Sequence, residues 1–416
     1  MLSNFISKKP NIRIYSLFLT VFIFINLLFQ EDAFNLNVRG TWIYVADMCI
    51  LFLGLFELLI QKKKFRFLEL KENLRFLIPF VVVTLYSIFL NFFTHKTPLY
   101  ISINTGLYWI IPILVGIVVG LNMGIFGIYI IYNAVLLNYT CVVAKCISVN
   151  GISYLFKWST YSENYGSLLE VHPIGLALPL FLIFFLFRYY QDKVHLKWTF
   201  WIGVLYTFMC GKRIALLGIV VVFILYHILS KTSKKFEKKQ LNFFMLLFFI
   251  LAFVYLLLVK YDIIESLAHI AGIDTMSRVE TWDALKTQYH ISPLFLGNGV
   301  GFSTYYLHNI DGVYIYGYIN KVGDVHNDIL KTYIDAGFLM FIFYMWFLFI
   351  SNLRFFLRKC CIKSALLYFL LISYTFILMF CDNIMRYDLY LLALFAIPMT
   401  YKRKEENDKR LLATRI

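Results

Sequence analysis

Apolar runs of about twenty residues, separated by short polar segments, follow one another along most of the 416-residue chain. An α-helix needs about 20 mostly apolar residues to cross the hydrocarbon core of a bilayer. The pattern therefore predicts an all-α polytopic membrane protein with about 12 transmembrane helices. The predicted spans are residues 12–30, 42–60, 75–93, 103–121, 124–146, 172–190, 196–210, 213–230, 241–260, 329–350, 364–382 and 387–401.

Two polar segments interrupt this pattern at greater length, residues 261–328 and residues 147–171. Most of the 39 lysine and arginine residues fall elsewhere, in clusters such as 62–75 and 231–239. Because basic residues mark cytoplasmic loops, both termini are predicted to be cytoplasmic and the two polar segments extracytoplasmic. We therefore interpret residues 1–416 as a single integral membrane domain. Its large loop, 261–328, is predicted to contain an amphipathic helix and to act as a lid.

Composition supports this class and excludes others. The chain is 61% hydrophobic with a mean hydropathy of +0.73, whereas soluble domains are nearer half apolar. The net charge of +15 does not indicate a nucleic-acid partner, because the basic residues occupy short loops between apolar runs. The seven cysteines show no CxxC spacing, and the acidic residues of the outer segment are scattered. No metal site and no cofactor is predicted.

Three residues on the predicted extracytoplasmic side stand where a helix is predicted to begin. Arg213 opens the span 213–230. Ser277 and Glu280 form a capping box around Arg278, at the start of the predicted amphipathic helix. His326 precedes the span 329–350. Helix N-termini attract anions, so these positions are candidate binding residues. The alternatives are a snorkelling Arg213, a solvated Arg278 and a structural histidine.

The span after His326 carries two further patterns. Gly337 follows His326 by eleven residues, about three helical turns, which predicts that both face the same way. Gly337 would then let a lipid chain or another helix approach below the histidine, or would be an ordinary helix-packing glycine. Lys331 and Asp335 are spaced i, i+4 and are expected to neutralise each other. The glycine-rich stretch 297–301 is expected to form a tight turn.

Several motifs follow one another along the chain. They are His172-Pro173, Gly211-Lys212-Arg213, Ser277-Arg278-x3-Trp282, Pro293-Leu294-Phe295-Leu296-Gly297-Asn298-Gly299 and His326-Asn327-x2-Leu330 with Gly337. In this order they resemble the O-antigen polymerase and O-antigen ligase superfamily of bacteria. The resemblance covers most of the chain in topology, while its sequence-specific part runs from about residue 205 to residue 340. One departure is Lys212, where members of the family often have a small polar residue.

The resemblance implies a glycosyltransferase that uses a polyprenyl-diphosphate-linked donor and no metal. Arg213 and Arg278 would hold the diphosphate, and His326 would be the general base or a further phosphate contact. The acceptor sugar would displace the carrier with inversion at the anomeric carbon. Further residues are predicted to bind substrate: Lys212, His172, Tyr333, Gly337, Asn327 and Trp282.

The leading hypothesis is a polymerase of undecaprenyl-diphosphate-linked repeat units, for capsule, exopolysaccharide or O-antigen synthesis. It would work at the outer leaflet of the bacterial plasma (inner) membrane. Its expected partners are the lipid-linked oligosaccharide, the bilayer, a chain-length regulator and a flippase. A ligase of the same fold, which moves the glycan to another acceptor, is the near alternative. A lipid-linked sugar flippase is the alternative from another class, although the predicted spans carry few charges along a central pathway.

Overall fold

The computed structural model describes residues 17–21, 24–25, 41–60, 64–156, 169–230, 234–272, 278–310, 313–315, 318–320 and 324–413. Within these residues the protein is helical, apart from one short antiparallel hairpin of β1 (Val313–Ile315) and β2 (Tyr318–Asn320). The helices are α3 (Thr41–Ile60), α4 (Lys64–Asn73), α5 (Ile78–Thr94), α6 (Leu99–Met123), α7 (Ile125–Asn150), α8 (His172–Asp192), α9 (Trp198–Met209), α10 (Arg213–Ser230), α11 (Lys234–Lys260), α12 (Ile263–Ile270), α13 (Arg278–Leu285), α14 (Phe302–Asn309), α15 (Asp328–Met345), α16 (Asn352–Lys359), α17 (Ile362–Met379) and α18 (Asp388–Ala413). Shorter helical turns are η1 (Leu74–Leu77), η2 (Ile152–Phe156), η3 (Lys286–Gln288), η4 (Trp346–Ser351) and η5 (Ile384–Arg386).

Eight helical segments of the described chain are long and apolar enough to cross a membrane. They coincide with eight of the predicted spans, so a polytopic helical membrane protein is confirmed. Helices α3, α9 and α18 cover three further predicted spans without being among these eight. The predicted span 12–30 lies largely outside the described residues, so the count of twelve stays a prediction, as does the sidedness of the loops and termini.

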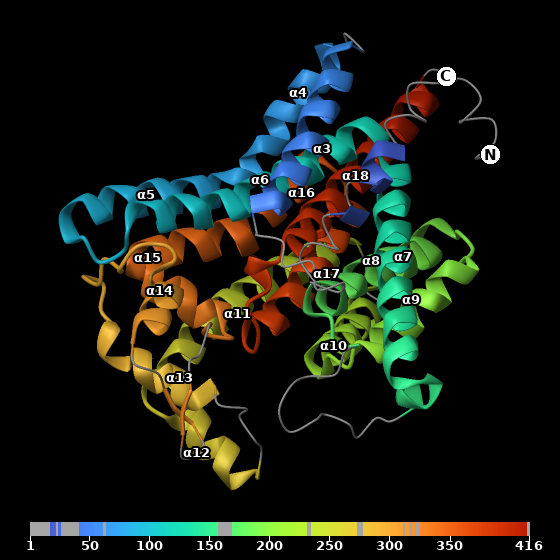
Figure 1. The fold of residues 1–416 in the computed structure, drawn as a ribbon. Coiled ribbons are helices and arrows are strands. Elements are labelled where there is room, and N and C mark those ends of the chain that lie inside the picture. Colours follow the sequence, from blue (N-terminus) through green and yellow to red (C-terminus); the bar gives the residue numbers. More distant parts are fainter. Residues whose placement is uncertain are drawn as a thin grey trace.

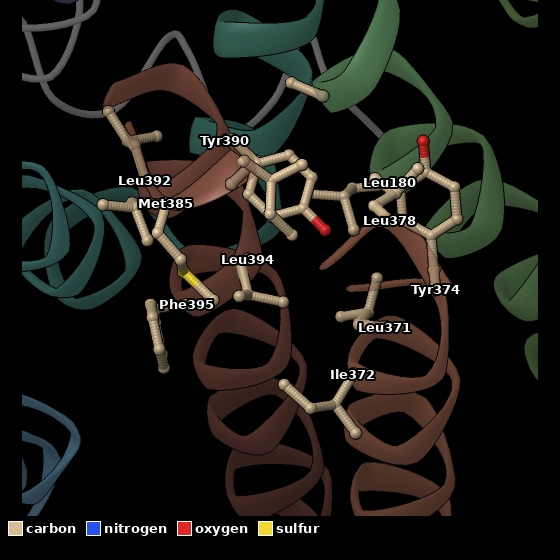
Figure 2. Close-up of a cluster of buried hydrophobic side chains, with 14 of the residues drawn as sticks. Leu180, Leu371, Ile372, Tyr374, Leu378, Met385, Tyr390, Leu392, Leu394 and Phe395 are labelled. Carbon is tan, nitrogen blue, oxygen red and sulfur yellow. The ribbon is translucent and has the colours of Figure 1, made fainter. Parts of the chain in front are cut away.

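The centre of the molecule is the contact of α18 with α6, α8 and α17. Gly116 of α6 allows a close approach, because a Cβ atom there would lie 2.7 Å from the carbonyl oxygen of Leu392. Figure 2 shows buried side chains of α17 facing those of α18. The buried tyrosines among them are satisfied: Tyr374 donates to the Leu176 carbonyl at 2.9 Å and Tyr390 to Thr375 Oγ1 at 2.8 Å. This bundle is the rigid base on which the outer segments rest.

The helix after His326 is broken at Gly337, which has φ 79° and ψ 175°. The break leaves backbone N–H and C=O groups without partners in the helix, and a neighbouring loop forms hydrogen bonds with them. Phe338 N donates to the Phe295 carbonyl at 2.8 Å, and Gly299 N donates to the Asp335 carbonyl at 2.8 Å. The expectation of one continuous face from His326 to Gly337 is therefore wrong. The element that approaches Gly337 is the glycine-rich loop, neither a lipid chain nor a helix.

The segment between α11 and α15 folds on the bundle. In Figure 1, α14 lies next to α15, while α12 and α13 extend to the end of the molecule opposite α4. Helix α13 begins at Arg278, as the capping pattern predicts. Its Trp282 and Leu285 are buried in the protein, so its apolar side packs inward. Trp282 Nε1 donates to the Val325 carbonyl at 3.0 Å, which ties α13 to the residue before His326.

Candidate functional site

A cavity of about 1090 Å³ lies among six segments of the described chain. Its walls come from α5, α6, residues 170–173 at the start of α8, the 300–308 region, the 324–336 region and residues 385–388. The lining combines charged groups with aromatic rings. His326, His172 and Arg386 line it, together with Tyr108 and Tyr387. Two of the predicted site residues, one from α8 and one from the turn before α15, thus share one space.

Residues 324–328 and 382–386 are joined side by side at this cavity. Asn327 N donates to Asn383 Oδ1 at 3.3 Å, and Met385 N donates to Asp328 Oδ2 at 2.9 Å. Asn327 also caps α15, because its Oδ1 accepts from Leu330 N at 3.0 Å. Two stretches about sixty residues apart in sequence therefore form one rigid wall.

His326 sits on this wall in an uncommon backbone conformation. Its φ is 49°, in the left-handed region that non-glycine residues seldom adopt. The surrounding hydrogen bonds and the cap at Asn327 hold it there. Strained backbone of this kind gathers at functional sites, which motivates a functional hypothesis for the histidine. Its side chain is 43% exposed and lines the cavity, so it is accessible to a ligand.

The buried carboxylate of Asp382, the partly buried carboxylate of Glu170 and one lysine connect the predicted site residues. His326 Nδ1 lies 3.9 Å from Asp382 Oδ1, and the other Asp382 oxygen lies 3.9 Å from Lys212 Nζ. Lys212 Nζ lies 2.7 Å from Glu170 Oε1 and 3.4 Å from His172 Nε2. The structure thus brings His172, Lys212 and His326 together. Lys212 is buried between carboxylates, so its charge serves to hold them.

Asp382 is ionised at the centre of this network. Burial alone would raise its pKa, but the His326 imidazole and the Lys212 ammonium outweigh burial and lower the pKa of Asp382. Only 5% of its side chain is exposed. A buried, ionised carboxylate next to an accessible imidazole orients the ring and stabilises a positive charge on it.

Neither Arg213 nor Arg278 is among the lining residues of the cavity in the described chain. Arg213 is the exposed first residue of α10, directly after Lys212. Arg278 opens α13 near Cys381: burial raises the pKa of the Cys381 thiol, and the Arg278 charge opposes that rise. Each arginine therefore lies beside a residue that adjoins or belongs to the Asp382 network. The resemblance implies that both arginines and His326 act on one substrate, but of these three residues only His326 lines the cavity.

The other residues predicted to bind substrate support the site from inside the protein. Tyr333 is fully buried and its hydroxyl donates to the His290 carbonyl at 2.9 Å. Asn327, also fully buried, donates from Nδ2 to the Tyr255 hydroxyl at 2.8 Å. Trp282 holds Val325 through its hydrogen bond, and Gly337 lets the glycine-rich loop approach α15. Direct contact of these four with substrate stays a prediction.

Lys331 and Asp335 do not form the pair that their spacing suggests. Lys331 Nζ lies 3.0 Å from Asp324 Oδ1. The Asp335 carboxylate instead accepts from Gly301 N at 2.9 Å and from Ser303 N at 2.8 Å. Asp335 therefore anchors the loop that leads into α14, and Asp324 receives the lysine.

An acidic group on α12 and α13 is neutralised within the protein. The carboxylates of Asp262, Glu265 and Asp283 come within 4.8 Å of one another. Lys286 forms ion pairs with Asp262 and, at 2.6 Å, with Asp283. An ammonium group already supplies the positive charge that such a group attracts, so it carries no argument for a metal.

Residues 198–345 match the sequence model of the O-antigen ligase family. The match supports the resemblance of this part of the chain to the O-antigen ligase and polymerase superfamily. The matched range contains Lys212, Arg213, Arg278 and His326, although His172, Asp382 and Arg386 lie outside it. No curated protein matches the chain. The match supports a function in the processing of lipid-linked glycans in a membrane.

The Asp324 ion pairs give the stability of this protein a measurable pH dependence. Burial alone would raise the pKa of Asp324, but Lys331 and Arg386 outweigh burial and hold it well below its usual range. The stabilisation is therefore fully present above the unfolded pKa of about 4 and is lost as pH falls toward the lower folded value. We expect Asp324→Asn to cost about 3 kcal/mol at pH 7 and pH 5, and less at pH 3, by thermal unfolding in detergent.

Asp283→Asn is the matched control for this measurement. Asp283 also pairs with a lysine, but its side chain is 45% exposed, so its loss should cost under about 1 kcal/mol at every pH. A difference between Asp324→Asn and the wild type that has already vanished at pH 5 would contradict the assignment.

Proposed function

We propose that this protein polymerises lipid-linked oligosaccharide repeat units for a bacterial capsule, exopolysaccharide or O-antigen. In the proposed reaction, a growing glycan leaves one undecaprenyl diphosphate carrier and joins the terminal sugar of a second lipid-linked unit. The reaction takes place at the outer leaflet of the plasma membrane. The observation that carries the proposal is the accessible His326 beside the buried Asp382, at a large cavity in a chain whose residues 198–345 match the O-antigen ligase family.

His326 is proposed to take the proton from the acceptor hydroxyl. An imidazole is suited to accept a proton near neutral pH. Because Nδ1 faces Asp382 at 3.9 Å, Nε2 is the nitrogen available to the acceptor. The Asp382 carboxylate then stabilises the imidazolium that forms as the proton moves. The network around Lys212 keeps this carboxylate in place.

The acceptor oxygen attacks the anomeric carbon of the donor as the hydroxyl loses its proton. One carbon–oxygen bond forms to the acceptor, the bond to the carrier phosphate breaks, and the electron pair leaves on the lipid diphosphate. Arg213 and Arg278 are proposed to bind this diphosphate. Guanidinium groups bind phosphate oxygens bidentately and stabilise the growing negative charge. The proposed reaction needs no metal or other cofactor from the protein.

The cavity has room for a saccharide part of the proposed substrates. Its volume of about 1090 Å³ lies just above the range of about 300–1,000 Å³ for small-ligand pockets. Its aromatic lining, which includes Trp109, Tyr305 and Tyr387, offers apolar faces to sugar rings. Imidazole groups in the same lining can form hydrogen bonds with sugar hydroxyls. These features favour a saccharide as the occupant.

The proposal is tested with the purified full-length protein in lipid vesicles and one substrate, the lipid-linked repeat unit. We expect a ladder of products whose masses rise by one repeat unit per step, measured by gel electrophoresis and mass spectrometry. A polymerase forms this ladder without any other acceptor, because the unit serves as donor and acceptor.

Three other outcomes would contradict the polymerase. The family match favours the ligase as the second candidate. A ligase would give no ladder and would form product only after a different acceptor is added. A flippase would give no covalent product and would move the intact unit between leaflets. The substrate returned unchanged, with no movement between leaflets, would reject both the polymerase and these alternatives. The proposed partners, a flippase and a chain-length regulator, are omitted so that the chemistry is measured alone.

A further inference from the structure

Arg386 presents a charged group to the cavity and has no role in the proposed reaction. It ends η5, in the short link between α17 and α18. Its side chain is 61% exposed although it lines the cavity, so the guanidinium extends into open space. One of its nitrogens, NH1, donates to Asp324 Oδ2 at 2.7 Å. This bond fixes the direction of a long side chain that would otherwise be mobile.

The ion pairs of Asp324 with Arg386 and Lys331 leave one positive charge without a balancing negative charge. Asp324 is 4% exposed and its two oxygens receive two cations, Lys331 at 3.0 Å and Arg386 at 2.7 Å. The two cations and one carboxylate carry a net charge of +1. The charge state is stable, because these partners lower the pKa of Asp324, and Asp324 outweighs the effect of burial and raises the pKa of Arg386.

Two neighbouring carboxylates also line the cavity, but they are buried and held by backbone N–H groups. Asp328 and Asp335 are each 3% exposed. Asp328 accepts from Met385 N at 2.9 Å, and Asp335 accepts from Gly301 N and Ser303 N. The accessible part of this cluster is therefore the guanidinium. It has five N–H donors, and Asp324 engages one nitrogen, so donors remain for a ligand.

We propose that Arg386 is an anion-binding residue of the cavity, which binds a carboxylate or phosphate group on the substrate. The assignment rests on the proposed function, because that function makes the cavity occupant a lipid-linked saccharide. It adds a third arginine, one that lines the cavity, whereas Arg213 and Arg278 are not among the lining residues. A guanidinium forms two parallel hydrogen bonds to either kind of oxyanion. The anion is a carboxylate on a sugar of the repeat unit or a phosphate of the carrier.

Binding measurements on the purified full-length protein in detergent test the assignment without requiring turnover. The probes are inorganic diphosphate and glucuronate, with glucose as the uncharged comparison. We expect Arg386→Gln to bind one anionic probe about tenfold or more weakly, the usual effect of losing a charged hydrogen bond. Arg386→Lys should fall between Arg386→Gln and the wild type, since it keeps the charge but loses the planar fork.

Arg354→Gln is the matched control. Arg354 lies on α16, at the far end of the membrane span that begins at Asp328, with its guanidinium 5.1 Å from the centre of the Trp346 ring. Its replacement should leave both affinities unchanged. Monodisperse elution of each variant shows that it has folded, and Arg386→Lys provides the comparison if Arg386→Gln fails to elute.

The probe that Arg386→Gln binds more weakly identifies the source of the anion. Weaker binding of diphosphate by Arg386→Gln supports the assignment and points to the carrier, whereas weaker binding of glucuronate supports it and points to an acidic sugar. Unchanged affinity for both probes, or a wild type that binds neither, overturns it. The repeat-unit ladder is scored separately. A wild-type ladder with unaltered binding in Arg386→Gln rejects Arg386 alone, and weakened binding without any wild-type ladder rejects the polymerase alone.

Discussion

Replacement of His326 by alanine is expected to lower the rate of polymer formation by about 10²–10⁴-fold, the range for loss of a general base. The imidazole lies in the cavity with Asp382 behind it, and alanine removes the group that would accept the acceptor proton. The rate is measured as incorporation of lipid-linked units into products longer than one repeat, with the amount of folded protein determined in the same vesicles.

His269→Ala is the matched control, because His269 is an exposed histidine on α12 in the same segment between spans. It should retain wild-type activity. Asp382→Asn should fall between the two, since it keeps the side-chain shape and removes the charge that stabilises the imidazolium. Normal chain lengths and rates in His326→Ala, with protein abundance unchanged, would refute the role of His326.

Replacement of Gly337 by alanine is expected to have the largest effect on folding. Its φ of 79° and ψ of 175° are nearly restricted to glycine, which alone costs about 1–3 kcal/mol for another residue. A Cβ atom would also overlap the Leu296 carbonyl and lie 2.5 Å from Gly297 N. These are backbone atoms that cannot rotate away. We expect a loss of more than about 3 kcal/mol, measured as thermal stability in detergent and as yield of monodisperse protein.

Gly151→Ala separates the two causes. Gly151 has φ 76° and ψ 163°, close to the values at Gly337, and a Cβ atom there would meet nothing within 4 Å. Its replacement should cost only the backbone part, about 1–3 kcal/mol. Equal losses for the two variants would show that the contact with the loop at Leu296 and Gly297 does not matter.

Much of the helical framework follows from local sequence. The predicted spans 103–121 and 172–190 correspond to α6 (Leu99–Met123) and α8 (His172–Asp192). The observed boundaries differ from the predicted ones by a few residues where turn residues end the helices. One such residue is Gly124, which has a φ of 57° and ends α6. The break at Gly337 could not be predicted, because it depends on a loop that begins about forty residues earlier along the chain. A helical spacing rule assumes an unbroken helix.

The site was predictable in part. His172, Lys212 and His326 stand at helix starts, and the structure brings them together around Glu170 and Asp382. Asp382 and Arg386 were not predicted as site residues, because they lie in a short link between two apolar runs. One signal was present: together with Asp388 they are the charged residues of the otherwise uncharged stretch 364–401. Charges at the ends of membrane spans are costly unless paired or functional.

The sequence by itself determined the class of this protein, the position of most of its helices and its resemblance to a superfamily, because hydropathy and short motifs are local properties. Tertiary structure alone decided which charges meet. Asp324 and Arg386 are 62 residues apart and pair at 2.7 Å, and Lys212 reaches Glu170 across 42 residues at 2.7 Å. The energy of such pairs depends on distance and burial, which spacing along the chain does not encode.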